Sequence, residues 1–159
     1  MKPLFTESQR FNQWWAWVII IFACGFPFVG IYYQLILGKS FGDNPMSNNG
    51  LVIFAICSLL FVFMFYKMQL KTEITHENLS FRFIPFINRT ISLSEISSME
   101  VINYGFVGGW GIRLWTSYGT VYNVRGNKGL HIKLKNGKQL VIGTQKPEEL
   151  ENVVEQLNS

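Results

Sequence analysis

The chain has 159 residues, of which 48% are hydrophobic and 15% are charged, and its formal net charge is +4. This composition is too apolar for a soluble protein of this length, so it excludes a purely soluble globular domain. The apolar residues concentrate in two long segments near the N-terminus, which predicts a membrane protein.

The first apolar segment extends from Trp14 to Leu37 and contains no formal charge. A helix over these 24 residues rises about 36 Å, more than the roughly 30 Å hydrocarbon core of a bilayer. Aromatic residues mark both ends, as in the aromatic belts of membrane helices: Trp14, Trp15, Trp17, Tyr32 and Tyr33. A cleavable signal peptide is the alternative, but this segment is longer and more aromatic than such peptides are.

The tetrapeptide Thr6-Glu7-Ser8-Gln9 lies just before this segment and fits a helix capping box. In such a box the Thr6 hydroxyl and the Gln9 amide satisfy exposed backbone N–H groups. We therefore expect the first helix to begin here, and residues 1–70 to form a helical hairpin with spans over about 14–37 and 51–70.

The second apolar segment, Leu51 to Tyr66, is shorter, and the residues after it extend it to a full span. The link over residues 38–50 is rich in turn formers, which predicts antiparallel helices. Two basic residues precede the first span and two follow the second, against one in the link: Lys2 and Arg10, Lys67 and Lys71, and Lys39. This asymmetry predicts that both termini are cytoplasmic.

From residue 71 onward the sequence alternates between apolar and polar residues, with turn formers at short intervals, as in antiparallel β structure. About seven strands are expected: 68–75, 79–85, 89–93, 97–104, 112–124 (interrupted), 129–135 and 139–143. Asn136-Gly137 fits a type I′ hairpin turn, in which both central residues have positive φ.

The C-terminal residues 147–157 predict an amphipathic helix. Pro147 fits its first position, and the apolar residues recur on one face: Leu150, Val153, Val154 and Leu157. One apolar face must be buried, so this helix is expected to cap an open end of the sheet. Residues 71–159 therefore predict an α+β domain, a seven-stranded antiparallel partly open β-barrel with a C-terminal cap.

Two longer motifs accompany this order of elements: ISLSEISSMEV at residues 91–101 and NVRGNKGLHIKLKNGKQLVIGTQKPEEL at residues 123–150. Together with the two apolar segments they resemble the bacterial pleckstrin-homology-like (PH-like) domains of small integral membrane proteins, over residues 68–157. The resemblance implies the barrel fold and a location in the bacterial inner membrane. It carries over no individual binding residue, because such domains are similar to phosphoinositide-binding modules in fold only.

The charges outside the apolar segments are polarised. Residues 71–146 carry ten Lys or Arg side chains against four Glu, a net charge of +6, whereas residues 147–159 carry a net charge of −4. A domain tethered to the cytoplasmic leaflet would turn its positive side toward the anionic bilayer. The candidate residues for binding anions or lipid headgroups are Arg113, Arg125, Lys128, Lys133, Lys135 and Lys138.

The basic residues of the strand at residues 129–135 have a simpler explanation than anion binding. His131, Lys133 and Lys135 alternate with apolar residues and would form the solvent face of an ordinary strand.

The glycine-rich segment at residues 104–113 presents Phe106, Val107 and Trp110 as a possible interface loop. The simpler alternative is that these three side chains fill the barrel or pack against the spans.

Catalytic patterns are missing from residues 71–159, which contain no Asp and no Cys, and His76 and His131 are expected on the surface. No metal-ligand spacing, cofactor motif or nucleic-acid motif is present. We therefore expect a non-enzymatic, membrane-anchored binding or scaffolding module without cofactor or metal, which contacts anionic lipid headgroups or a membrane protein. The alternative is a structural membrane protein that acts through homo-oligomerisation or a protein partner.

Overall fold

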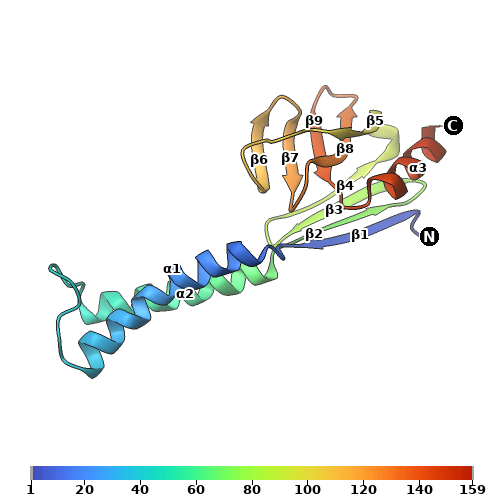
Figure 1. Ribbon diagram of the computed structural model, residues 1–159. Coiled ribbons are helices and arrows are strands. Elements are labelled where there is room, and N and C mark those ends of the chain that lie inside the picture. The colour runs from blue at the N-terminus through green and yellow to red at the C-terminus, as the bar shows by residue number, and fades with distance from the viewer. Residues whose placement is uncertain (1, 159) are drawn as a thin grey trace. The chain divides into compact units, whose positions relative to one another are not determined.

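The structure is a computed structural model that describes residues 2–158. It contains two compact units (Figure 1). One comprises the N-terminal segment up to Phe11 together with Met68 and the residues after it, and the other is Asn12–Lys67. The expected division at residue 71 therefore moves, because the N-terminal segment belongs to the β unit and not to the helical hairpin.

The helical unit is the predicted antiparallel hairpin. Helix α1 (Trp14–Ile31) continues as the π-helix η1 (Tyr32–Ile36), and α2 (Asn48–Lys67) lies beside it (Figure 1). Near the start of α1, the ring of Trp17 lies 5.3 Å from that of Phe65 near the end of α2.

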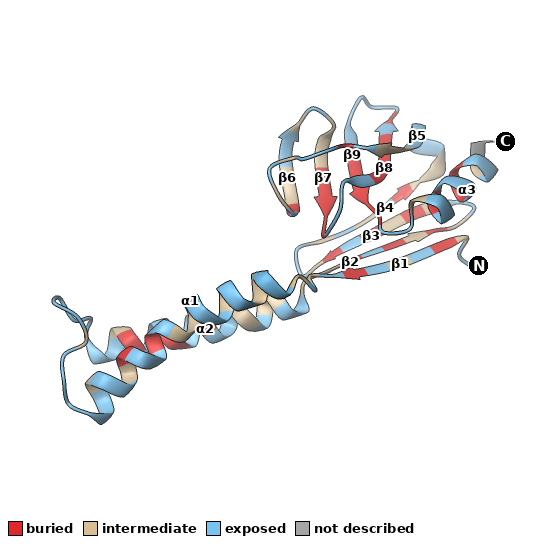
Figure 2. Cartoon of the chain, viewed as in Figure 1, coloured by how far each residue is buried: buried red, intermediate tan, exposed pale blue. Residues whose placement is uncertain are grey.

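The surfaces of these helices are largely apolar and exposed within the unit (Figure 2); Phe22, for example, is 83% exposed. Both helices are long and apolar enough to cross a membrane, with 23 residues over Trp14–Ile36 and 20 over Asn48–Lys67. The second helix ends at Lys67 and not at residue 70, because Gln69 begins a strand.

The β unit has two sheets. The first sheet has the order β1-β2-β3-β4 and is antiparallel: β1 (Phe5–Arg10), β2 (Gln69–Ile74), β3 (Asn78–Ile84) and β4 (Ile87–Ser92). The second sheet has the order β5-β8-β9-β7-β6: β5 (Ile96–Asn103), β6 (Gly111–Thr116), β7 (Gly119–Asn123), β8 (Lys128–Leu134) and β9 (Gln139–Gly143). The 3-10 turn η2 (Leu93–Glu95) joins the two sheets.

This arrangement corrects the expected single barrel of seven antiparallel strands. The described residues form nine strands in two sheets, and no closed barrel results. Residues 112–124 form two strands, β6 and β7, around a tight turn at Gly119, where an added Cβ would lie 2.1 Å from the Gln139 carbonyl oxygen. In addition, β7 pairs with β9 in parallel.

The N-terminal strand β1 corrects the predicted capping box. Residues 6–9 are extended and pair with β2 in register from Phe5↔Ile74 to Arg10↔Gln69. Phe5 is 1% exposed and points into the core, while Thr6 points outward. The Gln9 amide donates a 2.7 Å hydrogen bond to the carbonyl of Gly143 on β9, which ties the edge strand to the second sheet.

One apolar core lies between the two sheets and the C-terminal helix α3 (Pro147–Asn158). Phe81 on β3 and Tyr122 on β7 meet across it, with ring centroids 4.8 Å apart. The predicted face of α3 is confirmed, since Leu150, Val153 and Val154 are buried in this core.

The Asn136-Gly137 turn differs from its predicted type. Gly137 has a φ of 82°, but Asn136 is not in the positive-φ region. The Gly137 N–H donates to the Leu134 carbonyl at 2.9 Å, and the Leu134 N–H donates to the Lys138 carbonyl at 2.9 Å. This pattern is a three-residue hairpin loop, which needs positive φ at the glycine alone.

Because Phe5 fills the core from an edge strand, we expect Phe5→Ala to destabilise the β unit by about 3–5 kcal/mol. Denaturant unfolding of the full-length protein in detergent micelles measures this change. The neighbouring substitution Thr6→Ala, on the outer face, is the control and should change stability by no more than about 0.5 kcal/mol. Equal effects of the two substitutions would show that β1 does not contribute to the core as described.

Candidate anion-binding site

The six basic residues predicted as an anion site do not converge. Lys128 begins β8 and Arg125 lies in the loop before it, whereas Lys133, Lys135 and Lys138 lie at the end of β8 and in the turn after it. A strand of seven residues is about 20 Å long, so one small anion cannot contact both groups. The strand itself has the predicted inner face, because Leu130, Ile132 and Leu134 are buried.

Arg113, the sixth of these residues, lies on the edge strand β6 and folds back over the glycine-rich loop. Its Nη2 donates a 3.1 Å hydrogen bond to the Trp110 carbonyl. Gly109 makes this possible, since it has a φ of 121° and a Cβ there would lie 2.5 Å from Nη2. Arg113 therefore stabilises the glycine-rich loop that precedes its strand.

His131 was expected on the solvent face, and this is wrong. Its side chain is only 6% exposed, with Nε2 3.1 Å from the Gln139 side-chain oxygen and Nδ1 3.5 Å from a Glu100 carboxylate oxygen. The ring of Tyr118 packs edge-on against it at 5.6 Å. Neighbouring strands thus cover the central part of this outer face, while Lys133 stays exposed.

The glycine-rich loop divides the predicted interface residues. Val107 packs on a small second cluster formed by Tyr104, Val121 and Val141, whereas Phe106 is 87% exposed and Trp110 is 38% exposed. Trp115 on β6, which sequence reasoning did not single out, is 94% exposed and has a φ of 55°.

Tyr104 holds the glycine-rich loop in place through hydrogen bonds of its hydroxyl group. Burial raises the pKa of Tyr104 above its ordinary value, and the hydrogen bond from the Asn123 amide lowers the pKa by a smaller amount. Tyr104 in turn donates to the Gly126 carbonyl at 3.3 Å. Its hydroxyl thus links the loop before β6 to the loop after β7.

A different set of basic residues does converge, on the outer face of the first sheet. Strand register places Ser8, Lys71 and Arg82 in one row across β1, β2 and β3. The next row on the outer face, closer to the point where β1 leads into α1, pairs Arg10 with Gln69. We call the three exposed side chains Arg10, Lys71 and Arg82 the cationic face.

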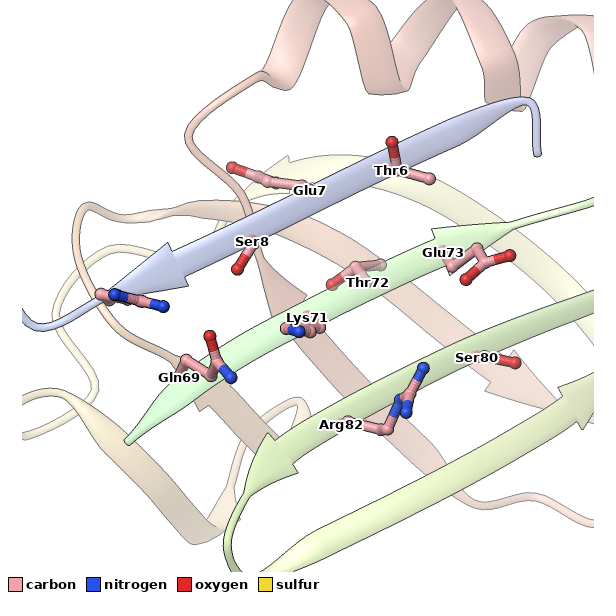
Figure 3. Close-up of a pocket in the computed structure, with 10 residues that line it drawn as sticks. Thr6, Glu7, Ser8, Gln69, Lys71, Thr72, Glu73, Ser80 and Arg82 are labelled. Atoms are coloured by element: carbon pink, nitrogen blue, oxygen red, sulfur yellow. The ribbon is translucent and has the colours of Figure 1, made fainter. Parts of the chain in front are cut away.

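An open pocket of about 310 Å³ lies over this face (Figure 3). Basic, hydroxyl and amide side chains make up most of its wall, with two carboxylates: Thr6, Glu7, Ser8, Arg10, Gln69, Lys71, Thr72, Glu73, Ser80 and Arg82. Figure 3 shows Lys71 and Arg82 as neighbours on adjacent strands, with Ser8 on the strand beyond Lys71. Positive charge next to hydroxyl donors suits an anion with several oxygen atoms, such as phosphate.

The two carboxylates that line the pocket offset its three positive charges only in part. Within residues 2–158, no ion pair involves Arg10, Lys71 or Arg82. Glu73 lies in the row beyond Lys71, paired with Ser80, on the side away from Arg10. Lys71 and Arg82 are directly opposite each other, an arrangement that costs stability unless an anion bridges them.

The edge strand that carries Arg10 is held firmly at its middle. The two carboxylate oxygens of Glu7 accept hydrogen bonds from the Thr144 hydroxyl at 2.7 Å and the Gln145 N–H at 2.8 Å. Glu7 is therefore occupied with these donors beyond β9. This bonding fixes β1 against the second sheet and thereby positions Arg10 beside Gln69.

Sequence reasoning missed the cationic face because its members are distant in the chain. Arg10 and Lys71 entered only counts of charge, and Arg82 stood on a strand with no assigned partner. Alternation along residues 79–85 does place Arg82 outward, but only the register with β2 brings it opposite Lys71.

No protein-family model and no curated protein sequence matches the chain.

If the cationic face binds phosphate, phosphate should stabilise the full-length protein in micelles more than chloride does at equal ionic strength. At ten times the dissociation constant the gain is about 1.4 kcal/mol. Lys71→Gln should remove this gain and, by relieving like-charge repulsion, raise stability in chloride by roughly 0.2–1 kcal/mol. Lys138→Gln is the control, since its turn lies elsewhere; the same phosphate gain in both variants would contradict the site.

Proposed function

We propose that the protein is a non-enzymatic, membrane-anchored binding module, in which the cationic face binds the anionic headgroups of lipids in the bilayer that holds the helices. The observation that carries the proposal is the convergence of Arg10, Lys71 and Arg82 near the end of the first sheet at which β1 leads into α1 and α2 leads into β2. The proposal includes insertion of α1 and α2 in a bacterial inner membrane, with both termini cytoplasmic.

Chain connectivity limits how far this face can be from the helices. Arg10 precedes Trp14 by four residues, and Gln69 follows Lys67 by two. Four extended residues reach about 14 Å, so Arg10 stays close to the beginning of α1 whatever the angle between the units. If α1 begins at the membrane surface, Arg10 therefore lies within reach of the headgroups.

The electrostatics of the face favour the same ligand. A basic side chain near an anionic leaflet contributes about 1 kcal/mol, and the effect declines within a Debye length of about 8–10 Å. Arg10 stands nearest the helix end of the sheet, and Lys71 and Arg82 follow two residues further along their strands. Successive strand residues rise about 3.3 Å, so Lys71 and Arg82 lie only about 7 Å further along the strands than Arg10, less than one Debye length.

The resemblance to PH-like domains supports a binding module in general terms, since the β unit combines antiparallel strands with a C-terminal helix. The predicted residues Arg113, Arg125, Lys128, Lys133, Lys135 and Lys138 would then contribute net charge and not a common site.

A protein partner is the second candidate function. The exposure of Phe106 and Trp115 on the edge strand β6 and the loop before it favours this alternative, because such large aromatic side chains are enriched at protein interfaces. A partner or a second copy bound there would make the module a scaffold, in agreement with the structural alternative drawn from the sequence.

A soluble form of the β unit tests the headgroup proposal. Because Arg10 pairs with Gln69, a short Gly-Ser linker in place of residues 12–67 can close β1 and β2 as a hairpin. Circular dichroism and cooperative unfolding first confirm that this form folds. It should then sediment with anionic vesicles and not with neutral ones, and binding should weaken at high salt.

Two double variants that lose the same charge distinguish binding at the cationic face from attraction of the vesicles by net charge alone. Lys71→Gln with Arg82→Gln should weaken vesicle binding roughly thirtyfold, at about 1 kcal/mol for each side chain. Lys128→Gln with Lys135→Gln should weaken it much less. Equal losses would indicate net charge alone, and a folded wild-type form that ignores anionic vesicles would overturn the proposal.

A further inference from the structure

We propose that the turn between β3 and β4, Ile84-Pro85-Phe86, inserts into the interface of the bilayer and holds the first sheet end-on to the membrane. The inference rests on the membrane anchoring in the proposed function, but it concerns an apolar contact and not the cationic face. Its partner is the lipid bilayer itself.

Strand register places this turn at the helix end of the sheet. Arg10 pairs with Gln69, and Gln69 pairs with Ile84, so the three residues form one row across β1, β2 and β3. The chain leaves this row toward α1 after Arg10 and returns from α2 just before Gln69. The β3–β4 turn therefore projects from the same end of the sheet at which both connections to the apolar helices lie.

The turn is apolar and open to its surroundings. Phe86 is 51% exposed, whereas Phe81 and Phe83 on the preceding strand are fully buried. Its N–H donates to the Phe83 carbonyl at 2.8 Å, and the two rings lie 6.5 Å apart. Phe11 packs edge-on against Phe83 at 6.4 Å, so the exposed ring of Phe86 lies next to a pair of packed aromatic rings.

The opposite end of the same sheet has a different character. There β2 and β3 are joined by Thr75, His76 and Glu77, a polar turn in which the Thr75 hydroxyl accepts the Asn78 N–H at 3.0 Å. A polar turn at one end and an apolar turn at the other give the sheet a polarity along its strands. The apolar end coincides with the connections to the helices.

The position of the apolar turn, at the end of the sheet that connects to the helices, favours the bilayer over a protein as the partner of Phe86. An exposed aromatic ring at the end of the sheet that connects to two membrane helices gains free energy by entering the interfacial region, as aromatic and basic residues at membrane surfaces do. Arg82 precedes the turn and lies on the outer face, where its guanidinium can stay at headgroup level while Phe86 enters deeper.

Spin-label depth measurements on the full-length protein test the inference. Cys24 and Cys57 are replaced by Ser, and a single Cys is introduced at Phe86 or at His76. The proteins are reconstituted in vesicles of neutral phosphatidylcholine, and collisions of the label with oxygen and with a water-soluble nickel complex are compared. We expect a severalfold higher oxygen-to-nickel ratio at residue 86 than at residue 76.

The same low ratio at both positions, with unfolding midpoints matching the parent protein, would overturn the inference. Phe86→Ser provides a second measurement that needs no label at the turn: in this variant a spin label at Asn88 should become more accessible to the nickel complex. Unchanged accessibility would also count against insertion. Neutral lipid separates the two proposals, since apolar insertion persists there while headgroup binding by the cationic face requires anionic lipid.

Discussion

The pairing of β1 with β2 is the interaction on which the other features of the β unit depend. It recruits the N-terminal residues to the first sheet, so that the helical hairpin becomes an insertion between two hydrogen-bonded strands. Both connections to the helices must therefore leave from one end of the sheet. Without this pairing, Arg10 would lie on a loose N-terminal segment, and neither the cationic face nor the orientation of the β3–β4 turn would be defined.

The two proposed membrane contacts follow from this single constraint and use different physics. The cationic face offers long-range attraction that salt screens, whereas the ring of Phe86 offers a short-range apolar contact that salt leaves unchanged. Together they would hold the sheet in a fixed orientation above the bilayer. The aromatic residues of the β6 edge, above all Trp115, would then remain available for a protein partner.

Features set by local patterns could be predicted from the sequence, and those set by pairing could not. The two apolar helices, the buried face of α3 and most strands follow from composition and periodicity. Strand β1 was missed because residues 6–9 also fit a capping box and pair with residues far along the chain. For the same reason the convergence of Lys71 with Arg82 was hidden, and His131 was misplaced because Tyr118 and Gln139 cover it.

The central claim is that lipid headgroups occupy the cationic face in the native membrane. A photo-crosslinking residue in place of Ser8, which lies beside Lys71 on the outer face, tests this claim most directly. After irradiation of intact membranes, mass spectrometry of the purified full-length protein should find an adduct with an anionic phospholipid. Adducts formed with a protein alone, or with neutral lipid in proportion to its abundance, would contradict the account.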